Sequence, residues 1–358
     1  MRRRWLIPVA ALVGLAFPAV ASAHASPAVF TLSNQTTGNS VLVFSRAADG
    51  SLAPAGSAAT GGAGTGANLN SQGALALSPD GRRLYAVNAA SNTVTVFGVH
   101  GTHLRWLAAV PSGGTTPTSV TAAHGRVYVL NAGTPGVTGF WATGHGLRRI
   151  DNGSTHLAAA DSAPAQVSLN PAATALAVTN TGSNTIDTIT LNGDGSIRHL
   201  RSNPSTGLTP FGFAFTRGGV LVVSDAHQTP TSAATTYRIG HTGALSLLSG
   251  PVAADELAAC WVAITGRLAF TADAGSGTIS AFRVGHGGRL HLVHAAAADA
   301  GATSHPLDES ITPDGRYLDV LTDGLHSLTS YRIGNDGSLT LVGATGALPG
   351  GDVSVASS

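Results

Sequence analysis

The sequence predicts an all-β fold, a closed ring of seven four-stranded antiparallel sheets, on three observations. First, one pattern of strands and turns recurs about every 48 residues, a period typical of propeller blades. Second, no segment repeats apolar residues at helical spacing, and the 46 glycines and 17 prolines suit a chain of strands and turns. Third, a spare strand follows the seventh repeat, where it can complete the first sheet.

The first strand of each repeat is short and mostly apolar. Copies lie at Leu75–Leu77, Val120–Ala122, Val167–Leu169, Phe213–Phe215, Val262–Ile264 and Glu309–Ile311. The N-terminal repeat has no such strand before Val29, whereas Val353–Val355 is left over at the other end. We therefore expect the C-terminal strand to complete the first blade, which ties the ends of the chain together and removes an exposed sheet edge.

The remaining strands follow in a fixed order. The second strand usually ends in Asn or Asp, as in Arg83–Asn88 and Leu268–Asp273, because short polar residues suit a tight bend. The third strand alternates apolar and polar residues, as in Val94–Phe97, which places one set of side chains on each face of a sheet. A glycine turn such as Asp336-Gly337 then leads into the fourth strand.

Residues 1–23 have the three parts of a secretory signal peptide. Arg2–Arg4 form a basic start, an apolar stretch follows, and Ala21-Ser22-Ala23 is a cleavage site of the A-x-A type. The alternative, an uncleaved membrane anchor, fits the short apolar run less well. We expect a secreted or extracytoplasmic protein in which residues 24–358 form one propeller domain, with no membrane span after cleavage. Both the general secretory and the twin-arginine routes stay open.

Composition excludes several classes of function. All 19 basic residues are arginine, charged residues make up only 10% of the chain, and no basic cluster suggests nucleic acid or an anionic membrane. Cys260 is alone, so the chain cannot form an internal disulfide. The sequence lacks a C-x-x-C-H motif, and a haem or quinone cofactor is not expected. Four histidines, His100, His145, His241 and His286, take the turn position of an aspartate in other repeats, and we predict no metal site.

The predicted topology places nine ionisable residues on one face. In a four-stranded blade, the loops into the first strand share a face with the loops from second to third strand. The predicted catalytic residues there are His305, Glu256 and Glu309, and the predicted substrate-binding residues are Asp225, His227, Asp273, Asp308, Asp323 and His326. Glu309 takes a position that is apolar in the other repeats. Its carboxyl must therefore lie in a wet channel or beside a paired group, or else its burial costs desolvation free energy. The alternative is a structural acid near the channel.

Three phrases carry a resemblance to a known family. They are Leu77–Asn88, Ser91–Val96 and Thr312–Leu318. These residues resemble the lactonase-type seven-bladed propellers, which include propeller-type 6-phosphogluconolactonase and fungal 3-carboxymuconate cyclase, and more broadly the YVTN surface-layer repeats. The resemblance covers essentially all of residues 24–358 and specifies the blades more than the activity.

The resemblance implies a site where the chain enters the inner strands. Catalytic relatives carry Pro followed by Arg or His there, with further Arg and Glu on the same face. Here the prolines persist as Pro117-Thr118, Pro164-Ala165, Pro210-Phe211 and Pro306-Leu307. His305-Pro306 keeps part of the pattern, and Glu256 or Glu309 can match the acid, but no arginine lies at these positions. Arginine is the usual donor to carboxylate and oxyanion charge, so a phosphorylated substrate is not expected.

Two functional hypotheses remain open. In the first, the protein is an exported lactonase-family propeller that hydrolyses or forms a non-phosphorylated lactone, with His305 as general acid or base and Glu256 or Glu309 as its acid partner. In the second, it is a non-catalytic extracellular propeller that binds a protein or a glycan, which the missing arginines and scarce charge favour. The expected partner is a small lactone or carboxylate in the first case, and the expected state is a monomer.

Overall fold

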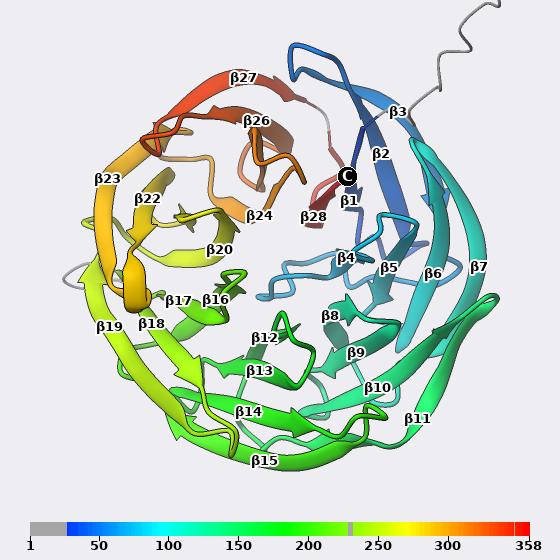
Figure 1. Ribbon diagram of the computed structural model, residues 1–358. Coiled ribbons are helices and arrows are strands. Elements are labelled where there is room, and N and C mark those ends of the chain that lie inside the picture. Colours follow the sequence, from blue (N-terminus) through cyan, green and yellow to red (C-terminus); the bar gives the residue numbers. More distant parts are fainter. Residues whose placement is uncertain (1–26, 228–231, 347) are drawn as a thin grey trace, which may run out of the picture.

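The computed structural model describes residues 27–227, 232–346 and 348–358, which form a ring of seven four-stranded sheets (Figure 1). The predicted signal peptide and its cleavage site lie outside the described residues. Every sheet is antiparallel, and its first strand is the innermost one. The predicted seven-bladed all-β fold is therefore confirmed.

The blades are numbered in chain order, each from the inner to the outer strand. Blade 1 contains β28 (Val353–Ser357), β1 (Ala28–Leu32), β2 (Ser40–Arg46) and β3 (Leu52–Ala59). Blade 2 contains β4 (Leu75–Leu77), β5 (Arg83–Asn88), β6 (Thr93–His100) and β7 (His103–Pro111). Blade 3 contains β8 (Pro117–Ala123), β9 (Arg126–Asn131), β10 (Gly136–Thr143) and β11 (Gly146–His156).

The other four blades repeat the same order. Blade 4 contains β12 (Pro164–Leu169), β13 (Ala175–Asn180), β14 (Thr185–Leu191) and β15 (Ile197–Pro204). Blade 5 contains β16 (Pro210–Phe215), β17 (Val220–Asp225), β18 (Ala233–Ile239) and β19 (Leu245–Ala253). Blade 6 contains β20 (Ala259–Thr265), β21 (Leu268–Asp273), β22 (Thr278–Val284), the short 3-10 helix η1 (His286–Gly288) and β23 (Leu290–Asp299). Blade 7 contains β24 (Pro306–Ile311), β25 (Tyr317–Thr322), β26 (Ser327–Ile333) and β27 (Leu339–Thr345).

The C-terminal strand closes the ring as predicted. β28 pairs antiparallel with β1, with Thr31 opposite Val355. The Ala28 backbone N–H donates to Ser358 Oγ at 2.9 Å, which fastens the two ends of the first blade. The seam to blade 7 is held by a buried ion pair between Arg46 and Asp319, while Ser357 Oγ donates to the same carboxylate at 2.6 Å.

The apolar sides of neighbouring blades pack on each other to form the core. Between blades 6 and 7, for example, Phe270 and Ile279 pack in one buried cluster with Leu318 and Val320. Since each blade buries its faces only against its neighbours, the ring holds every inner strand in a fixed place. In the part of the chain that the structure describes, no helix is long and apolar enough to cross a membrane.

A segment of the chain crosses the central channel. The connection from β3 to β4 spans residues 60–74, far longer than the connection of residues 112–116 between β7 and β8. Its last part, residues 69–73, is called the channel segment here and runs toward the middle of the ring (Figure 1). Ser119 Oγ in blade 3 donates to Gln72 O at 2.7 Å, and Trp261 Nε1 in blade 6 donates to Ser71 O at 3.2 Å. The segment therefore joins inner strands on opposite sides of the ring.

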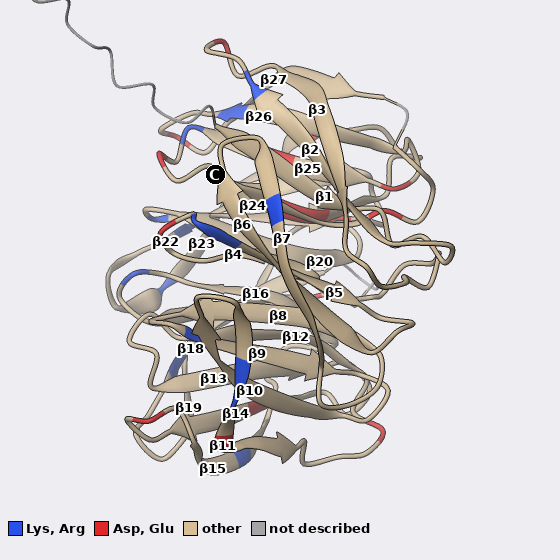
Figure 2. Cartoon of the chain, turned by 90° about the vertical axis from the view of Figure 1, so that its right-hand side faces the viewer, with Lys and Arg blue, Asp and Glu red and all other residues tan. Residues whose placement is uncertain are grey.

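The two faces of the ring differ in charge. The face that carries the loops into the inner strands, together with the second-to-third strand loops, is called the acid face. None of its described loops contains arginine. The opposite face, called the arginine face, carries turns such as residues 78–82 and 192–196 and has most of the arginines (Figure 2). Its aspartates are held by their own turns, as when Ser196 Oγ donates to Asp194 at 2.7 Å.

Candidate functional site

His305 lies on the acid face, at the residue before β24. Its φ of 44° is in the left-handed region, and so are the φ values of the equivalent residues Thr116, Ala163, Thr209 and Ala258. The backbone shape is thus a property of the blade, repeated where the chain turns into an inner strand. What distinguishes blade 7 is the imidazole, which is exposed to solvent.

One hydrogen bond fixes the orientation of the His305 ring. Its Nδ1 lies 3.2 Å from the carbonyl oxygen of Ala274, the residue after Asp273. A carbonyl oxygen can only accept, so this contact places a proton on Nδ1, and in the neutral ring the lone pair is then on Nε2. The exposed Nε2 is then free to accept a proton from water or substrate. The Asp323 backbone N–H also donates to His305 O at 3.3 Å, which ties His305 to the next loop of blade 7.

Glu309 is buried deeper along β24. Its side chain is 4% exposed, and neither carboxylate oxygen has a hydrogen-bond partner among the described residues. Burial raises the pKa of this carboxyl well above 4.5, and the charges of Asp273 and Asp308 raise it further. The equivalent inner-strand residues in blades 3 to 6 are Val120, Val167, Phe213 and Val262. An acid at this position has no counterpart in those blades.

Asp308, the residue before Glu309, is equally buried, but its carboxylate oxygens have hydrogen-bond partners. Its carboxylate accepts hydrogen bonds from Ser354 Oγ at 2.6 Å and from the Gly73 backbone N–H at 3.2 Å. The backbone N–H of Glu309 donates to its other oxygen at 2.9 Å. Burial raises the Asp308 pKa, and these hydrogen bonds oppose that rise. The structure thus places this predicted substrate-binding residue between β28 and the channel segment, with its oxygens engaged.

Asp225 and Asp273 end the second strands of blades 5 and 6 and are both buried. Thr235 Oγ1 donates to Asp225 at 2.5 Å, and Ser280 Oγ donates to Asp273 at 2.7 Å. In blade 2 the equivalent bond runs in the other direction, with Asn88 Nδ2 donating to Thr95 Oγ1 at 2.9 Å. Burial raises the pKa of Asp225 to about 7 and that of Asp273 to about 8. Both predicted substrate-binding residues therefore hold the bend between the second and third strands.

Glu256 and His227 are half-buried on the same face. The backbone oxygen of Glu256 accepts bonds from Ser232 N and Oγ, both at 2.9 Å, which fixes the loop that carries it. The charge of Glu256 raises the pKa of Asp273, so the two carboxyls lie near each other. Of the two predicted acid partners, Glu256 is the one that solvent reaches.

Asp323 and His326 lie in the second-to-third strand loop of blade 7, half-buried and exposed respectively. The His326 backbone N–H donates to Asp323 O at 3.1 Å, and His326 O accepts from Leu348 N at 2.9 Å. This loop faces Asp352, an acid that our sequence interpretation missed. Asp352 is 4% exposed and without a partner for either oxygen in the described residues, and its pKa is raised to about 8 by burial and by the charge of Asp323. Treating the tail before β28 as one more loop into an inner strand would have found it.

Six of the nine predicted residues fall into two neighbouring groups on the acid face. Glu256, Asp273, Glu309 and Asp308 influence one another electrostatically across blades 6 and 7, and Asp323 with His326 adjoins Asp352 toward blade 1. His305 lies between the groups, since it touches Ala274 on one side and Asp323 on the other. In residues 27–227, 232–346 and 348–358, no hydrogen bond joins His305 to Glu256 or Glu309, and no three potential ligands gather as a metal site.

Comparison with known proteins agrees with this architecture. The family described as Lactonase, 7-bladed beta-propeller matches residues 35–134 and 120–263. No curated protein matches the sequence. A putative 6-phosphogluconolactonase from Bacteroides fragilis superposes with a TM-score of 0.73 at 18% identity, over 94% of this chain and 99% of that one.

A second solved structure has the same ring. The periplasmic gluconolactonase PpgL of Pseudomonas aeruginosa superposes with a TM-score of 0.70 at 15% identity, over 92% of this chain and 99% of that one. At these identities the superpositions establish the fold alone. The family match covers more than half of the chain, and this protein belongs to the lactonase family of seven-bladed β-propellers.

Proposed function

We propose that the protein is an exported hydrolase that opens a non-phosphorylated lactone on its acid face. The observation that carries the proposal is the contact of His305 Nδ1 with the carbonyl oxygen of Ala274. Its Nδ1 is committed to Ala274 O at 3.2 Å, which leaves Nε2 as an exposed base on a face whose other ionisable side chains are mostly carboxyls. A ring held through one nitrogen and free at the other is the arrangement that general-base catalysis needs.

The reaction follows from that geometry. His305 Nε2 takes a proton from a water molecule while the water oxygen bonds to the lactone carbonyl carbon. The tetrahedral intermediate then expels the ring oxygen, and the imidazolium returns the proton to it, so that the product is a hydroxy acid. Glu256 is accessible enough to act as the acid partner, whereas the oxygens of Glu309 are covered.

The choice of a non-phosphorylated substrate rests on charge. The described loops of the acid face contain no arginine, and a phosphate dianion would lie among carboxyls with no cation to bind it. The predicted signal peptide at residues 1–23 supports the same choice, because sugar phosphates are cytoplasmic metabolites. The structurally similar P. aeruginosa protein is itself a periplasmic gluconolactonase.

A lactone-hydrolysis panel tests the proposal. Release of acid from glucono-δ-lactone and from its 6-phosphate would be followed in a pH-stat, with spontaneous hydrolysis subtracted. We expect the neutral lactone to be opened faster by about tenfold or more, and His305→Gln to lower kcat/KM by about 100-fold or more. His145→Gln, an exposed histidine in a turn of the opposite face, is the matched control and should keep full activity.

Two outcomes would contradict the proposal. Full activity in His305→Gln would remove the assignment of the base while leaving a lactonase with a different site. The absence of catalysed hydrolysis with any lactone of the panel would instead leave a propeller that binds a ligand without converting it.

A further inference from the structure

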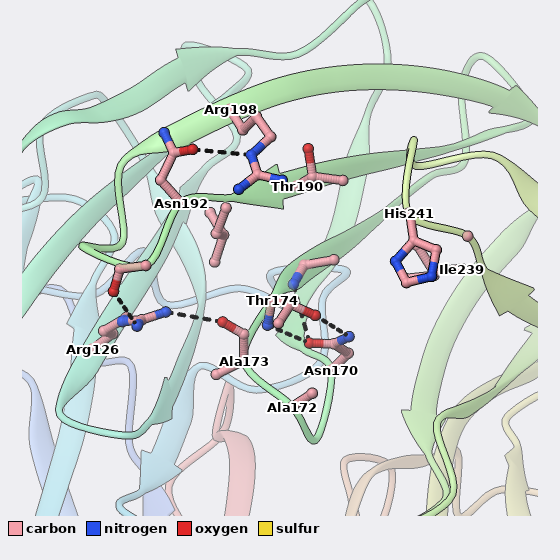
Figure 3. A pocket seen from close by; sticks show the side chains of 14 residues that line it. Arg126, Asn170, Ala172, Ala173, Thr174, Thr190, Asn192, Arg198, Ile239 and His241 are labelled. Carbon is pink, nitrogen blue, oxygen red and sulfur yellow. Dashed lines mark hydrogen bonds between the residues drawn. The ribbon is translucent and has the colours of Figure 1, made fainter.

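A second pocket lies on the arginine face, on the opposite side of the ring from His305. It has a volume of about 560 Å³ and opens between blades 3, 4 and 5. Its walls come from the first-to-second strand turn of blade 4, from the β14–β15 turn and from the β18–β19 turn, with Arg126 closing one side (Figure 3). Pockets of this size accept small organic ligands.

The lining residues include two arginines and no acid. Arg126 and Arg198 line the pocket together with His241, and no Asp or Glu is among its lining residues. Asp194 follows the lining residue Gly193, and its Oδ1 accepts bonds from Ser196 N at 3.0 Å and Ser196 Oγ at 2.7 Å. The Asp194 carboxylate also interacts with the charge of Arg126, so Arg198 is the cation left for a ligand.

Arg126 forms a fixed part of the wall. Its Nη1 donates to Ala173 O at 2.9 Å and its Nη2 donates to Gly193 O at 2.8 Å, so the guanidinium bridges two turns of blade 4. The Nε of Arg126 is buried without an acceptor among the described residues. Because this Nε is buried, it is not available to a ligand, and the role of Arg126 is to hold together the two turns that form the wall.

Arg198 is the side chain that can bind a ligand directly. It is exposed, and its Nε donates to Asn192 Oδ1 at 3.0 Å, which holds the guanidinium over the pocket (Figure 3). Its two Nη groups have no hydrogen-bond acceptor among the described residues. Two parallel N–H groups of this kind match a carboxylate or phosphate. His241 projects from the opposite wall, so an anion between them would be held from both sides.

The rest of the wall mixes apolar residues, such as Leu191 and Ile239, with polar ones. Asn170 Oδ1 accepts from Thr174 N at 2.8 Å and from Ala175 N at 3.1 Å, which fixes the blade 4 turn. The Thr174 and Thr190 hydroxyls also line the pocket. Hydroxyl and amide groups around a cationic centre suit a ligand that carries several hydroxyls of its own.

We propose that this pocket binds a small polyhydroxylated anion, such as a sugar acid or a sugar phosphate, with the anionic group on Arg198 and the hydroxyls on the threonines. The site is separate from the proposed catalytic centre, and its occupation does not depend on lactone hydrolysis.

Isothermal titration calorimetry tests the pocket. Gluconate and glucose 6-phosphate would be titrated into the protein, with sorbitol as the neutral polyol. We expect saturable binding of one or both anions, no binding of sorbitol, and a loss of affinity of about tenfold or more in Arg198→Gln. Arg201→Gln is the matched control, because Arg201 is also exposed on β15 but does not line the pocket.

The outcomes separate this proposal from the catalytic one. Lactone hydrolysis should be unchanged in Arg198→Gln, and anion binding that is sensitive to Arg198 should persist in His305→Gln. Equal weakening in Arg198→Gln and Arg201→Gln would show non-specific attraction and overturn the proposal. So would saturable binding that neither Arg198→Gln nor His241→Gln weakens, or no binding of either anion.

Discussion

Gln72 pairs with both backbone groups of Val262 across the central channel. Gln72 Nε2 donates to Val262 O at 3.1 Å, and the Val262 backbone N–H donates to Gln72 Oε1 at 3.2 Å. Gln72 belongs to the channel segment that leads into blade 2, and Val262 lies in blade 6, so a single side chain ties that segment to an inner strand of a blade that is not a neighbour of blade 2 in the ring. Gln166 does the same for Phe213 between adjacent blades, with bonds of 2.6 and 2.9 Å.

Replacing Gln72 by Ala should destabilise the ring. The substitution leaves the Val262 N–H and C=O buried without partners, which costs about 2 to 4 kcal/mol of the free energy of unfolding. Guanidinium denaturation followed by tryptophan fluorescence would measure the loss. Gln35→Ala removes an amide that bonds Gly350 O in an exposed setting, and should cost less than about 1 kcal/mol. An equal effect of the two substitutions would show that the channel segment does not brace the ring.

Replacing Glu309 by Leu should stabilise the protein. Leucine restores the apolar residue type of the other inner strands and removes a buried carboxyl that has no hydrogen-bond partner among the described residues. The pKa of Glu309 is raised in the folded state, so ionising this carboxyl costs folding free energy. That cost is absent below the unfolded pKa and grows as the pH rises above it. We expect Glu309→Leu to raise Tm at pH 7 and to change it little at pH 4. A lower Tm at pH 7 would show that the carboxyl has a stabilising partner.

Replacing Asp273 by Asn should make stability less dependent on pH. Asn88 shows that an amide can make the hydroxyl bond of this position, so the bend should survive. The folded pKa of Asp273 is about 8 against 3.8 for a free side chain, so the wild-type protein loses stability as the pH rises between these values. Asp273→Asn should therefore raise Tm at pH 8 more than at pH 4, as scanning calorimetry would record.

A turn aspartate provides the opposite control for Asp273. The pKa of Asp336 is lowered by its bonds to Ser338, so its contribution to stability is lost as the pH falls. Asp336→Asn should consequently lower Tm at neutral pH and have less effect in acid. If both asparagine variants moved Tm in the same direction at pH 8, burial would not be the origin of the Asp273 shift.

Removing Arg46 should weaken the seam between blades 1 and 7. Arg46→Ala leaves Asp319 buried without its cation, a change that costs about 3 to 5 kcal/mol in comparable buried pairs. Arg332→Ala is the matched control, because Arg332 is exposed and also stacks on Tyr317, at 5.7 Å. That control should cost less than about 1 kcal/mol in urea denaturation. A small loss in Arg46→Ala would indicate that β28 closes the ring without help from this pair.

The repeat and its closure could be predicted because they depend on local chemistry. Asn88 and Asp273 end second strands for the same reason, a bend whose hydroxyl bonds lie a few residues away. The spare strand at Val353–Val355 was visible because every other repeat already had one. Periodicity therefore specified the blades, their order and the face on which the acids gather.

The hydrogen bonds of Asp308 to another blade and to the channel segment could not be predicted from the repeat. Asp308 and Glu309 are adjacent in sequence, yet the first bonds Ser354 and Gly73 while the second has no partner among the described residues. Adjacent residues of a strand face opposite sides, and here one side meets the channel segment. That segment follows a glycine-rich stretch without any alternation, so its bonds to Val262 could not be foreseen.

The pairing of β28 with β1 has a consequence for biosynthesis. β1 meets its inner neighbour only once residues 353–357 are available, so the ring stays an unsealed arc while the chain between them is being made. Loop closure over that sequence distance makes the final step slow compared with the folding of single hairpins. Anything that occupies the free edge of β1 in the interval competes directly with the native tail.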